Sequence, residues 1–216
     1  MKQSLSIVIT AGPTREHLDP VRFLSNPSTG KMGFAIAAAA ARRGHDVVLV
    51  AGPVSLPTPK GVRRVDVVSA REMLDAVVAA LSQKTDRPRL LISTAAVADW
   101  RPAECARSKL KKHQMSGILR LVRNPDILKT VTGCMKVGFA AETDNVLAEA
   151  ARKCREKNLA FIVANDVTEK GSGFGTDTNR VTFVFPDGTL RRHPLMTKRR
   201  VAGAILREIE AKSRNA

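Results

Sequence analysis

Short apolar runs alternate with amphipathic stretches from one end of the chain to the other. The runs predict buried strands at residues 5–10, 46–50, 62–67, 89–93, 136–139 and 160–164. The stretches carry apolar side chains at helical spacing and predict helices at residues 30–43, 70–82, 145–157 and 196–212. Strands that alternate with helices predict an α/β fold, here a Rossmann-like, mostly parallel sheet with helices on both faces.

Turn residues predict two smaller features. Residues 180–185 and 189–192 flank Pro186-Asp187-Gly188, which predicts a small β-hairpin extension of the sheet. Residues 118–122 alternate between apolar and polar side chains, so they favour a further strand. Both features lie outside the regular succession of strands and helices.

The ends of two helices carry recognisable capping residues. Ser28 or Thr29 is expected to cap the helix over residues 30–43, and Gly44 is expected to end it. Asn124-Pro125-Asp126 introduces a short helix, because proline suits the first turn.

Length and composition favour one globular domain over residues 1–216. The chain is 44% hydrophobic, which is enough to bury a core, and it shows no internal repeat and no obvious linker. No apolar run approaches the roughly 20 residues of a membrane span. The N-terminus reads as a strand without the pattern of a signal peptide, so a cytoplasmic location without a membrane partner is expected.

The metal-binding residue types are scattered. Cys105, Cys134 and Cys154 are odd in number and far apart, which argues against a disulfide framework and a cysteine-based zinc site. The four histidines offer no paired spacing. Any metal is therefore expected to be Mg²⁺, held by carboxylates and substrate phosphates, with protein ligands that the sequence leaves unknown.

The charge balance favours an anionic ligand. The formal net charge is +16, from 36 basic and 20 acidic residues. Such an excess attracts nucleic acid or phosphorylated small molecules. Aromatic residues make up 4% of the chain and tyrosine is absent, so platforms for stacking single-stranded nucleic acid are scarce. Most of the charge is interpreted as solvated surface, with a minority at a phosphate site and no nucleic-acid partner.

The strand at residues 89–93 runs toward Asp99, and a lysine cluster follows at Lys109, Lys111 and Lys112. Ligands of open parallel sheets bind at the carboxyl ends of the strands. Lysines in a loop can close over a triphosphate and neutralise charge during group transfer. The pattern indicates a polyanion site, whereas the alternative is a capping aspartate with a solvated basic loop.

A second motif joins the first strand to the first helix. Small residues let main-chain amides approach a phosphate, and the helix N-terminus adds positive potential. The pattern is neither a Walker A loop nor a dinucleotide fingerprint. A non-standard phosphate loop is favoured over a purely structural turn, with these candidates: Gly12, Ser28, Gly30 and Lys31.

Two further segments follow later strands. Phe139 could stack on a base, although core packing is the ordinary role of a single phenylalanine. Lys153 and Lys157 share one helix face and could bind a ligand, whereas the alternative is an ordinary solvated surface. Asn165-Asp166-Val167 and Gly171-Ser172-Gly173-Phe174-Gly175 suit ligand binding and turns equally.

Taken in order, these segments resemble bacterial phosphopantothenate–cysteine ligase of coenzyme A biosynthesis. The resemblance extends from about residue 7 to the hairpin near residue 186, and the final third is less distinctive. The motifs that carry it are Ile9-Thr10-Ala11-Gly12-Pro13-Thr14-Arg15-Glu16, residues 25–33, Ala95-Ala96-Val97-Ala98-Asp99, Lys109-Leu110-Lys111-Lys112, Asn124-Pro125-Asp126-Ile127, Gly138-Phe139-Ala140-Ala141-Glu142-Thr143 and Ala164-Asn165-Asp166.

The resemblance implies a ligation in two steps. The carboxylate of 4'-phosphopantothenate attacks the α-phosphate of CTP, which releases pyrophosphate and gives an acyl-cytidylate. The amine of L-cysteine then displaces CMP and forms the amide. Magnesium is implied. Such activation needs positioning and charge neutralisation more than a protein nucleophile, so the lack of a Ser-His or Cys-His constellation is no objection.

The resemblance also assigns roles by motif position. Asn26 would hold the acyl intermediate, and Lys109 would act in catalysis, in the step with cysteine. Ala95 and Ala96 would offer main-chain contacts to the substrate, and Arg22 would bind its phosphate, in one reading from a partner subunit. The implied CTP site consists of Asp99, Lys109, Pro125, Asp126, Ile127, Leu128, Phe139, Lys153 and Lys157.

The family implies a homodimer and a link to phosphopantothenoylcysteine decarboxylase, separate or fused. Because the chain starts at the ligase strand, it is expected to be a stand-alone ligase or an excised domain, without flavin or decarboxylation. The lysine cluster resembles CTP-using more than ATP-using relatives. A nicotinamide-dependent reductase and a basic nucleic-acid-binding module remain as alternatives, although the missing tyrosine, the missing glycine fingerprint and the sparse aromatics weaken both.

Overall fold

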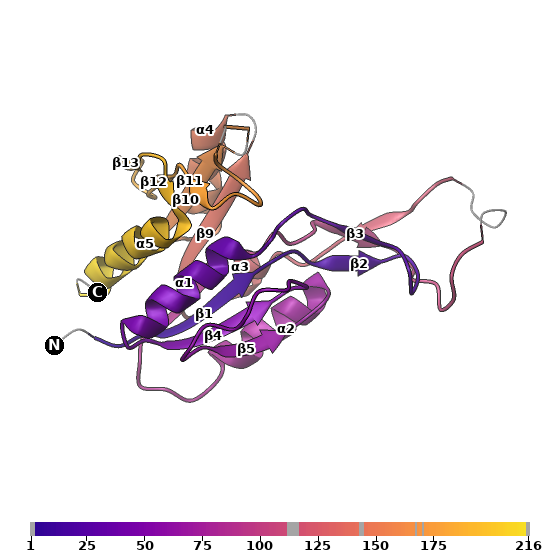
Figure 1. Cartoon of the computed structure of the whole chain (residues 1–216), viewed down its shortest axis with the longest axis horizontal. Helices are drawn as coiled ribbons and strands as arrows, with labels where there is room; N and C mark the ends of the chain where they lie inside the picture. The colour runs from indigo at the N-terminus through magenta and orange to yellow at the C-terminus, as the bar shows by residue number, and fades with distance from the viewer. Residues whose placement is uncertain (1–2, 112–116, 143–144, 167, 170, 215–216) are drawn as a thin grey trace.

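An eight-stranded, mostly parallel sheet forms the centre of the molecule in this computed structural model (Figure 1). The structure describes residues 3–111, 117–142, 145–166, 168–169 and 171–214. The predicted fold class is confirmed. The strands of the sheet are β1 (Ser6–Ala11), β4 (Asp46–Ala51), β5 (Arg63–Asp66), β6 (Arg89–Ser93), β9 (Met135–Glu142), β10 (Phe161–Asp166), β12 (Thr182–Val184) and β13 (Leu190–Arg192).

The order of the strands shows where a ligand site belongs. The sheet runs β13-β12-β10-β9-β6-β1-β4-β5, and all neighbours from β10 to β5 are parallel. The chain winds outward from β1 to β4 and β5, and then returns to place β6 on the other side of β1. The carboxyl ends of β1 and β6 therefore flank the switch point, where open sheets bind ligands. The antiparallel strands β12 and β13 form the predicted hairpin extension at one edge.

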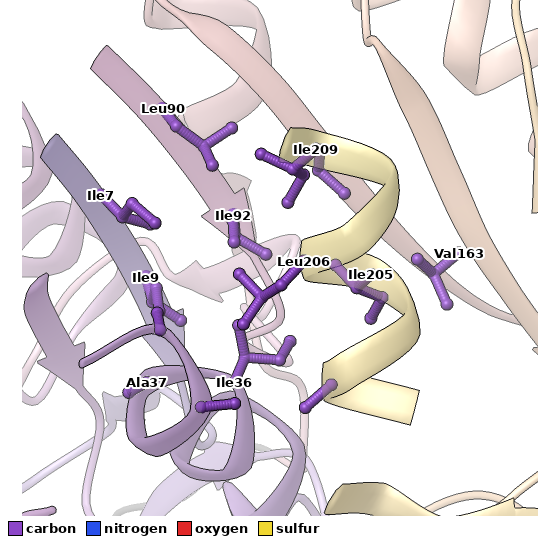
Figure 2. Packing of buried hydrophobic residues seen from close by; sticks show 14 of the residues in the cluster. Ile7, Ile9, Ile36, Ala37, Leu90, Ile92, Val163, Ile205, Leu206 and Ile209 are labelled. Carbon is purple, nitrogen blue, oxygen red and sulfur yellow. The ribbon is translucent and has the colours of Figure 1, made fainter. Parts of the chain in front are cut away.

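Helices cover both faces of the sheet, and consecutive strand residues alternate between the two cores. Ile7, Ile9 and Leu90 face helices α1 (Lys31–Arg42) and α5 (Lys198–Lys212), as Figure 2 shows, whereas Val8 and Leu91 belong to the opposite core. That second core packs against α2 (Ala70–Leu81), α3 (Ile127–Thr130) and α4 (Val146–Glu156). Among the described residues, no helix is long and apolar enough to cross a membrane.

Two small hairpins leave the carboxyl end of the sheet and form a projection, which we call the arm (Figure 1). It consists of residues 15–25 and of the described part of residues 100–123. Its strands are β2 (Arg15–His17) paired with β3 (Phe23–Ser25), and β7 (Trp100–Pro102) paired with β8 (Leu121–Arg123). The sequence pattern predicted one strand here, at residues 118–122, which overlaps β8 only at Leu121 and Val122. The strands β2, β3 and β7 were not predicted.

The predicted helix boundaries need two corrections. Neither Ser28 nor Thr29 caps α1, because Gly30 occupies the N-cap with a φ of 75° and no side chain caps the helix. The helix predicted from residue 196 begins at Lys198. A short pair forms in front of it between β11 (Thr178–Asn179) and β14 (Met196–Thr197), and the Thr197 side chain caps α5. Gly44 ends α1 as predicted, with a φ of 83°.

Candidate functional site

A cavity of about 380 Å³ opens at the carboxyl ends of the central strands. Its walls come from the loop before α1, the segment after β6, the start of α3, the end of β9 and one face of α4. We call it the main cavity. Among the residues predicted for the substrate and the nucleotide, it brings together Asn26, Ala95, Ala96, Asp99, Pro125, Asp126, Ile127, Leu128, Phe139, Lys153 and Lys157.

A smaller cavity of about 70 Å³ lies beside it at the N-terminus of α1. Ser28, Gly30 and Lys31 of the predicted phosphate loop line it. Gly12 lines neither cavity; it takes a φ of 79° in the turn after β1 and accepts a hydrogen bond from Ala96 N. The two cavities are neighbours, because both are lined by Thr94, Phe139, Ala141 and Phe174.

The first turn of α1 makes the small cavity suitable for an anion. With Gly30 at the N-cap, no side chain occupies the main-chain N–H groups of the helix start. Such groups and the helix dipole favour negative charge. Gly33 lets the helix approach β1 closely, since a Cβ there would lie 2.5 Å from Ala11 Cβ and from Thr94 Oγ1.

The small cavity also contains Asn165, which the sequence marked as suited to ligand binding and turns equally, and Asn179, to which the sequence gave no role. Asn165 at the end of β10 is 6% exposed, and its amide has no hydrogen bond with any described residue. Ser172 donates to Asn179 Oδ1 at 2.5 Å, which shapes the loop that carries Phe174. Strand-end position was the one signal for Asn165, whereas Asn179 has none.

Two lysines tie that loop to the helices behind it. Lys198, at the start of α5, donates to Gly173 O at 3.0 Å and to Thr176 O at 2.5 Å. Burial lowers the pKa of Lys198, and the nearby Lys31 adds to this effect. Lys31 binds Asp177 Oδ1 at 2.7 Å and Gly175 O at 3.1 Å. Phe174 is thereby held at the boundary between the two cavities.

Asn26 links the first loop to the segment after β6. Ser25 Oγ donates to Thr14 O at 2.7 Å, and Asn26 Nδ2 donates to Ala96 O at 3.1 Å. The Thr14 hydroxyl in turn accepts from Ala98 N at 3.0 Å. These bonds fix the amide of Asn26 in the wall of the main cavity.

Asp99 offers an exposed carboxylate with no bond to any described residue, whereas Asp126 is paired with Lys157 at 2.9 Å. In the described ranges, no group of three or more His, Cys, Asp and Glu residues could hold a metal ion. One carboxylate together with substrate phosphates is, however, a common way to bind Mg²⁺. The residues present fit a magnesium ion that arrives with a nucleotide.

Side chains fix the short helix α3 at both of its ends. Asp126 caps the helix by accepting from Lys129 N at 3.2 Å. The buried Lys136 donates to Leu128 O at 2.8 Å and to Val131 O at 3.3 Å, which satisfies carbonyl groups at the C-terminal end. The main-chain groups of residues 125–128 therefore hold a fixed position in the main cavity.

Arg22 and Lys109 stand apart from both cavities of their own chain, since both lie on the arm. Arg22 pairs with Asp19 at 2.6 Å, and Lys109 is exposed. Lys111 is exposed as well, and Lys112 falls outside the described residues, as do Thr143 and Val167.

Comparisons with known proteins identify the family. The profile of the DNA/pantothenate metabolism flavoprotein C-terminal domain matches residues 2–212. The bifunctional coenzyme A biosynthesis protein CoaBC of Escherichia coli K12 is 50% identical over 213 residues, which cover 95% of this chain and 51% of that protein. CoaBC of Bacillus subtilis 168 is 48% identical over 213 residues, covering 96% of this chain and 52% of that protein. The chain thus spans about half the length of these relatives.

Solved structures agree with the sequence comparison. The crystal structure of the C-terminal domain of CoaBC superposes with a TM-score of 0.82 at 42% identity, covering 99% of this chain and 98% of the other. A Cab2 variant in complex with phosphopantothenate-cysteine superposes with a TM-score of 0.74 at 17% identity, which shows a shared fold alone. It covers 99% of this chain and 89% of the other.

Proposed function

The chain belongs to the DNA/pantothenate metabolism flavoprotein C-terminal domain family, and from that premise we propose that it is a phosphopantothenate–cysteine ligase that uses CTP. One observation carries the proposal. Residues assigned to the substrate and the nucleotide come from separate segments of the sequence, and the fold gathers them around one cavity at the switch point of the sheet. That cavity is continuous in its lining with the anion-binding start of α1.

In the first step, the carboxylate of 4'-phosphopantothenate attacks the α-phosphorus of CTP, and the bond to pyrophosphate breaks. The N-terminus of α1 and Lys31 stabilise the phosphate groups, and the start of α3 with Phe139 holds the nucleoside. Lys153 and Lys157 add positive charge along one wall of the cavity. Charge placed before the reaction is worth more in a partly enclosed site than in water.

In the second step, the amine of L-cysteine attacks the acyl carbon and forms the C–N bond. The bond between the acyl carbon and the phosphate oxygen breaks, and CMP leaves with its electron pair. Asn26 holds the acyl group, since its amide is fixed against Ala96. Lys109 stabilises the negative charge that develops on the departing phosphate. The attacking amine nitrogen loses one proton to solvent as the amide forms.

A bound Mg²⁺ ion would neutralise phosphate charge, and Asp99 is the residue placed to hold it. The carboxylate of Asp99 is exposed at the cavity and makes no bond to a described residue, so it can accept a cation without losing a partner. Asp99→Asn should raise the concentration of Mg²⁺ needed for half-maximal activity and leave the fold unchanged.

We further propose a homodimer in which the arm completes the site of a second copy. Arg22 and Lys109 do not line the cavities of their own chain. The arm exposes apolar side chains that a second copy would cover, including Val21 at 57%, Trp100 at 45% and Leu121 at 42%.

Pyrophosphate release tests the reaction. The purified protein is supplied with Mg²⁺, 4'-phosphopantothenate and each of the four NTPs, with and without L-cysteine. We expect release that is selective for CTP and that requires phosphopantothenate, with amide product only when cysteine is present. Thermal shifts with NADPH or with a DNA duplex, in place of a shift with CTP, would instead favour the reductase or the nucleic-acid-binding module.

Mixed dimers test the sharing of the site. Copies with Asn26→Asp are combined with copies with Lys109→Gln, each of which by itself is expected to keep only a small, measurable residual activity. If Lys109 acts on the other subunit, the mixture regains about a quarter of the wild-type activity, since about half of the dimers are mixed and each has one intact site. No recovery in proven mixed dimers would place both residues in one chain's site.

A further inference from the structure

The turn between β2 and β3 contains a buried carboxylate that lies in neither cavity. Asp19 is fully buried at this turn on the arm. Its Oδ1 atom accepts from Val21 N and Arg22 N, both at 2.8 Å, and these two bonds close the turn. Closing a turn needs only this one oxygen.

The second oxygen of Asp19 binds a segment that is distant in the sequence. Oδ2 accepts from Arg22 Nη2 at 2.6 Å, from Arg22 Nε at 3.0 Å and from Leu110 N at 3.2 Å. Arg22 Nη2 also donates to Leu110 O at 2.8 Å. The Asp19–Arg22 pair therefore holds both main-chain groups of Leu110.

Leu110 stands between Lys109 and Lys111. We call residues 106–111 the lysine loop. Ala106 N donates to Leu18 O at 2.9 Å, so the same turn holds the loop at a second point. Lys109 is therefore the direct neighbour of a residue that the β2–β3 turn holds in place. We call the Asp19–Arg22 pair, which holds Leu110, the clamp.

The clamp keeps its charge over the working pH range. Burial by itself would raise the pKa of the Asp19 carboxyl group, but hydrogen bonds from the Arg22 guanidinium and from the main-chain N–H groups of Val21, Arg22 and Leu110 hold that pKa well below its usual range. Hydrogen bonds to an ionised acceptor are the stronger kind. The bond to Leu110 therefore persists at neutral pH.

We propose that Asp19 is a positioning residue for Lys109, which fixes the lysine loop to the β2–β3 turn and so sets where the lysine stands at the nucleotide site. The inference rests on the proposed function of Lys109, because positioning has meaning only if that lysine acts. Asp19 itself touches neither the substrate nor the nucleotide in this scheme.

The test uses Asp19→Asn and a matched control from the same hairpin. In Asp19→Asn one carboxylate oxygen becomes an NH₂ group, which cannot accept from both Arg22 and Leu110. The control is Glu16→Gln, since Glu16 is also buried in β2 but accepts from Ala70 N at 2.9 Å and has no contact with the lysine loop. We expect amide hydrogen exchange at Leu110 to rise at least about tenfold in Asp19→Asn and to stay unchanged in Glu16→Gln.

A double-mutant cycle with Lys109→Gln separates positioning from a general structural role. We expect Asp19→Asn to lower kcat about 10- to 100-fold in the wild-type background, because a small misplacement of a catalytic group has effects of this size. In the Lys109→Gln background the same change should lower kcat less than about threefold. Equal factors in both backgrounds would overturn the proposal, as would unchanged exchange at Leu110.

Two further outcomes are distinguishable. If the wild-type protein releases no pyrophosphate with CTP, the proposed function fails and the positioning role fails with it, whereas the exchange measurement still reports whether the clamp exists.

If Asp19→Asn does not fold, Leu110→Pro removes the same N–H donor and leaves the turn untouched. The cycle is then run with Leu110→Pro, and factors independent of the residue at position 109 would again contradict the proposal.

Discussion

The sheet and its helices differ from the arm in what stabilises them. In the sheet, strands such as β1 have side chains buried on both faces, and Ile7, Ile9 and Leu91 are essentially inaccessible. The arm consists of strands of three residues, and three of its larger apolar side chains, Ile118, Leu119 and Val122, are 79%, 44% and 37% exposed. The sheet can fold on its own core, whereas the arm has more apolar surface than its own residues cover.

The difference separates stability from activity. The main cavity lies at the carboxyl edge of the sheet, where β9 carries Phe139 and a hydrogen bond to Ala96 O fixes Asn26 in the loop before α1. Arg22 and Lys109, which we propose for the same site, lie on the arm. Changes to the core should therefore affect folding, and changes to the exposed face of the arm should affect association and turnover.

The largest expected effect comes from placing charge on the arm. Leu119→Asp combined with Leu121→Asp should abolish the dimer and lower activity about 100-fold or more, because a charge at the centre of an apolar interface removes its main attraction. Light scattering after size-exclusion chromatography and pyrophosphate release check this.

The control for that pair is Val78→Asp on α2, where the side chain is 44% exposed on the sheet's own helix layer. It should change neither the oligomeric state nor the activity. A monomeric wild-type protein with full activity would remove the basis of the comparison.

Next in size is a cavity in the core. Leu206→Ala on α5 removes a side chain with no exposed surface and should lower the free energy of unfolding by about 2–5 kcal/mol, as measured in urea. At low temperature the folded variant should still dimerise. Leu195→Ala, at a side chain that is 42% exposed, should change stability by less than about 1 kcal/mol. Similar losses in both variants would contradict the description of the core.

Gly52 lies at the junction between the sheet and the arm, and Gly203 in α5 serves as its control. A Cβ on Gly52 would lie 1.7 Å from Pro13 O, at the root of the arm, so Gly52→Ala should destabilise the protein by about 1–3 kcal/mol. Gly203 in α5 has only Arg207 Nη1 at 3.6 Å and Arg43 Nη2 at 4.0 Å near its Cβ position. Gly203→Ala should therefore stabilise the helix by about 0.5–1 kcal/mol. Thermal unfolding that shifts in the same direction for both would refute the predicted contrast.

The smallest expected effect is a pH dependence that comes from His193, the residue directly after β13. Burial lowers the pKa of His193, and Arg207 and Arg191 lower it further. The Nε2 atom is buried without a partner among the described residues, and the ring lies 4.5 Å from that of Phe183. The unfolded chain binds a proton at this histidine near pH 6.5, and the folded chain binds it only at a lower pH, so the free energy of unfolding falls as the pH drops below about 6.5.

Urea unfolding at pH 7.5 and pH 5.5 measures this dependence. His193→Phe removes the titrating group and should reduce the loss of stability between the two pH values. An equal loss in the variant and in the wild-type protein would assign the dependence to other groups.

The sheet was predictable because its pattern is local. Residues 89–93 and 160–164 are apolar runs with turns on either side, and no other element suits them. The strands of the arm are different, since Arg15–His17 contains no apolar residue and still forms a strand, because Phe23–Ser25 lies opposite and its Phe23 ring contacts Arg15 and His17. Such pairing depends on two segments together, so the sequence pattern of one segment does not predict it. The start of α1 was predicted wrongly for a related reason, as the left-handed backbone at Gly30 depends on the turn that precedes it.

The residues of the candidate site also fall into a predictable group and an unpredictable group. Motif positions predicted the wall of the main cavity, because each motif follows one strand and parallel strands end at one edge. Phe174 lies in the segment 171–175, which suited ligand binding and turns equally. Asn179 and Lys198 were given no role, since the antiparallel pair of β11 with β14 brings them to the small cavity from the last part of the chain. Their sequence has no motif that would indicate this placement.

The two outer strands of the sheet bear on how the protein behaves at high concentration. An open edge presents unpaired main-chain groups that invite a strand of another copy. Here one edge carries Arg63 and Arg64 on β5, and the other carries the exposed Arg191 and Arg192 on β13. Arg64 is paired with Asp66 and Arg191 with Glu208, so Arg63 and Arg192 carry most of the charge that two copies meeting edge to edge would bring together. Positive charge on both edge strands disfavours growth by sheet extension, which gives part of the basic excess a consequence for solubility.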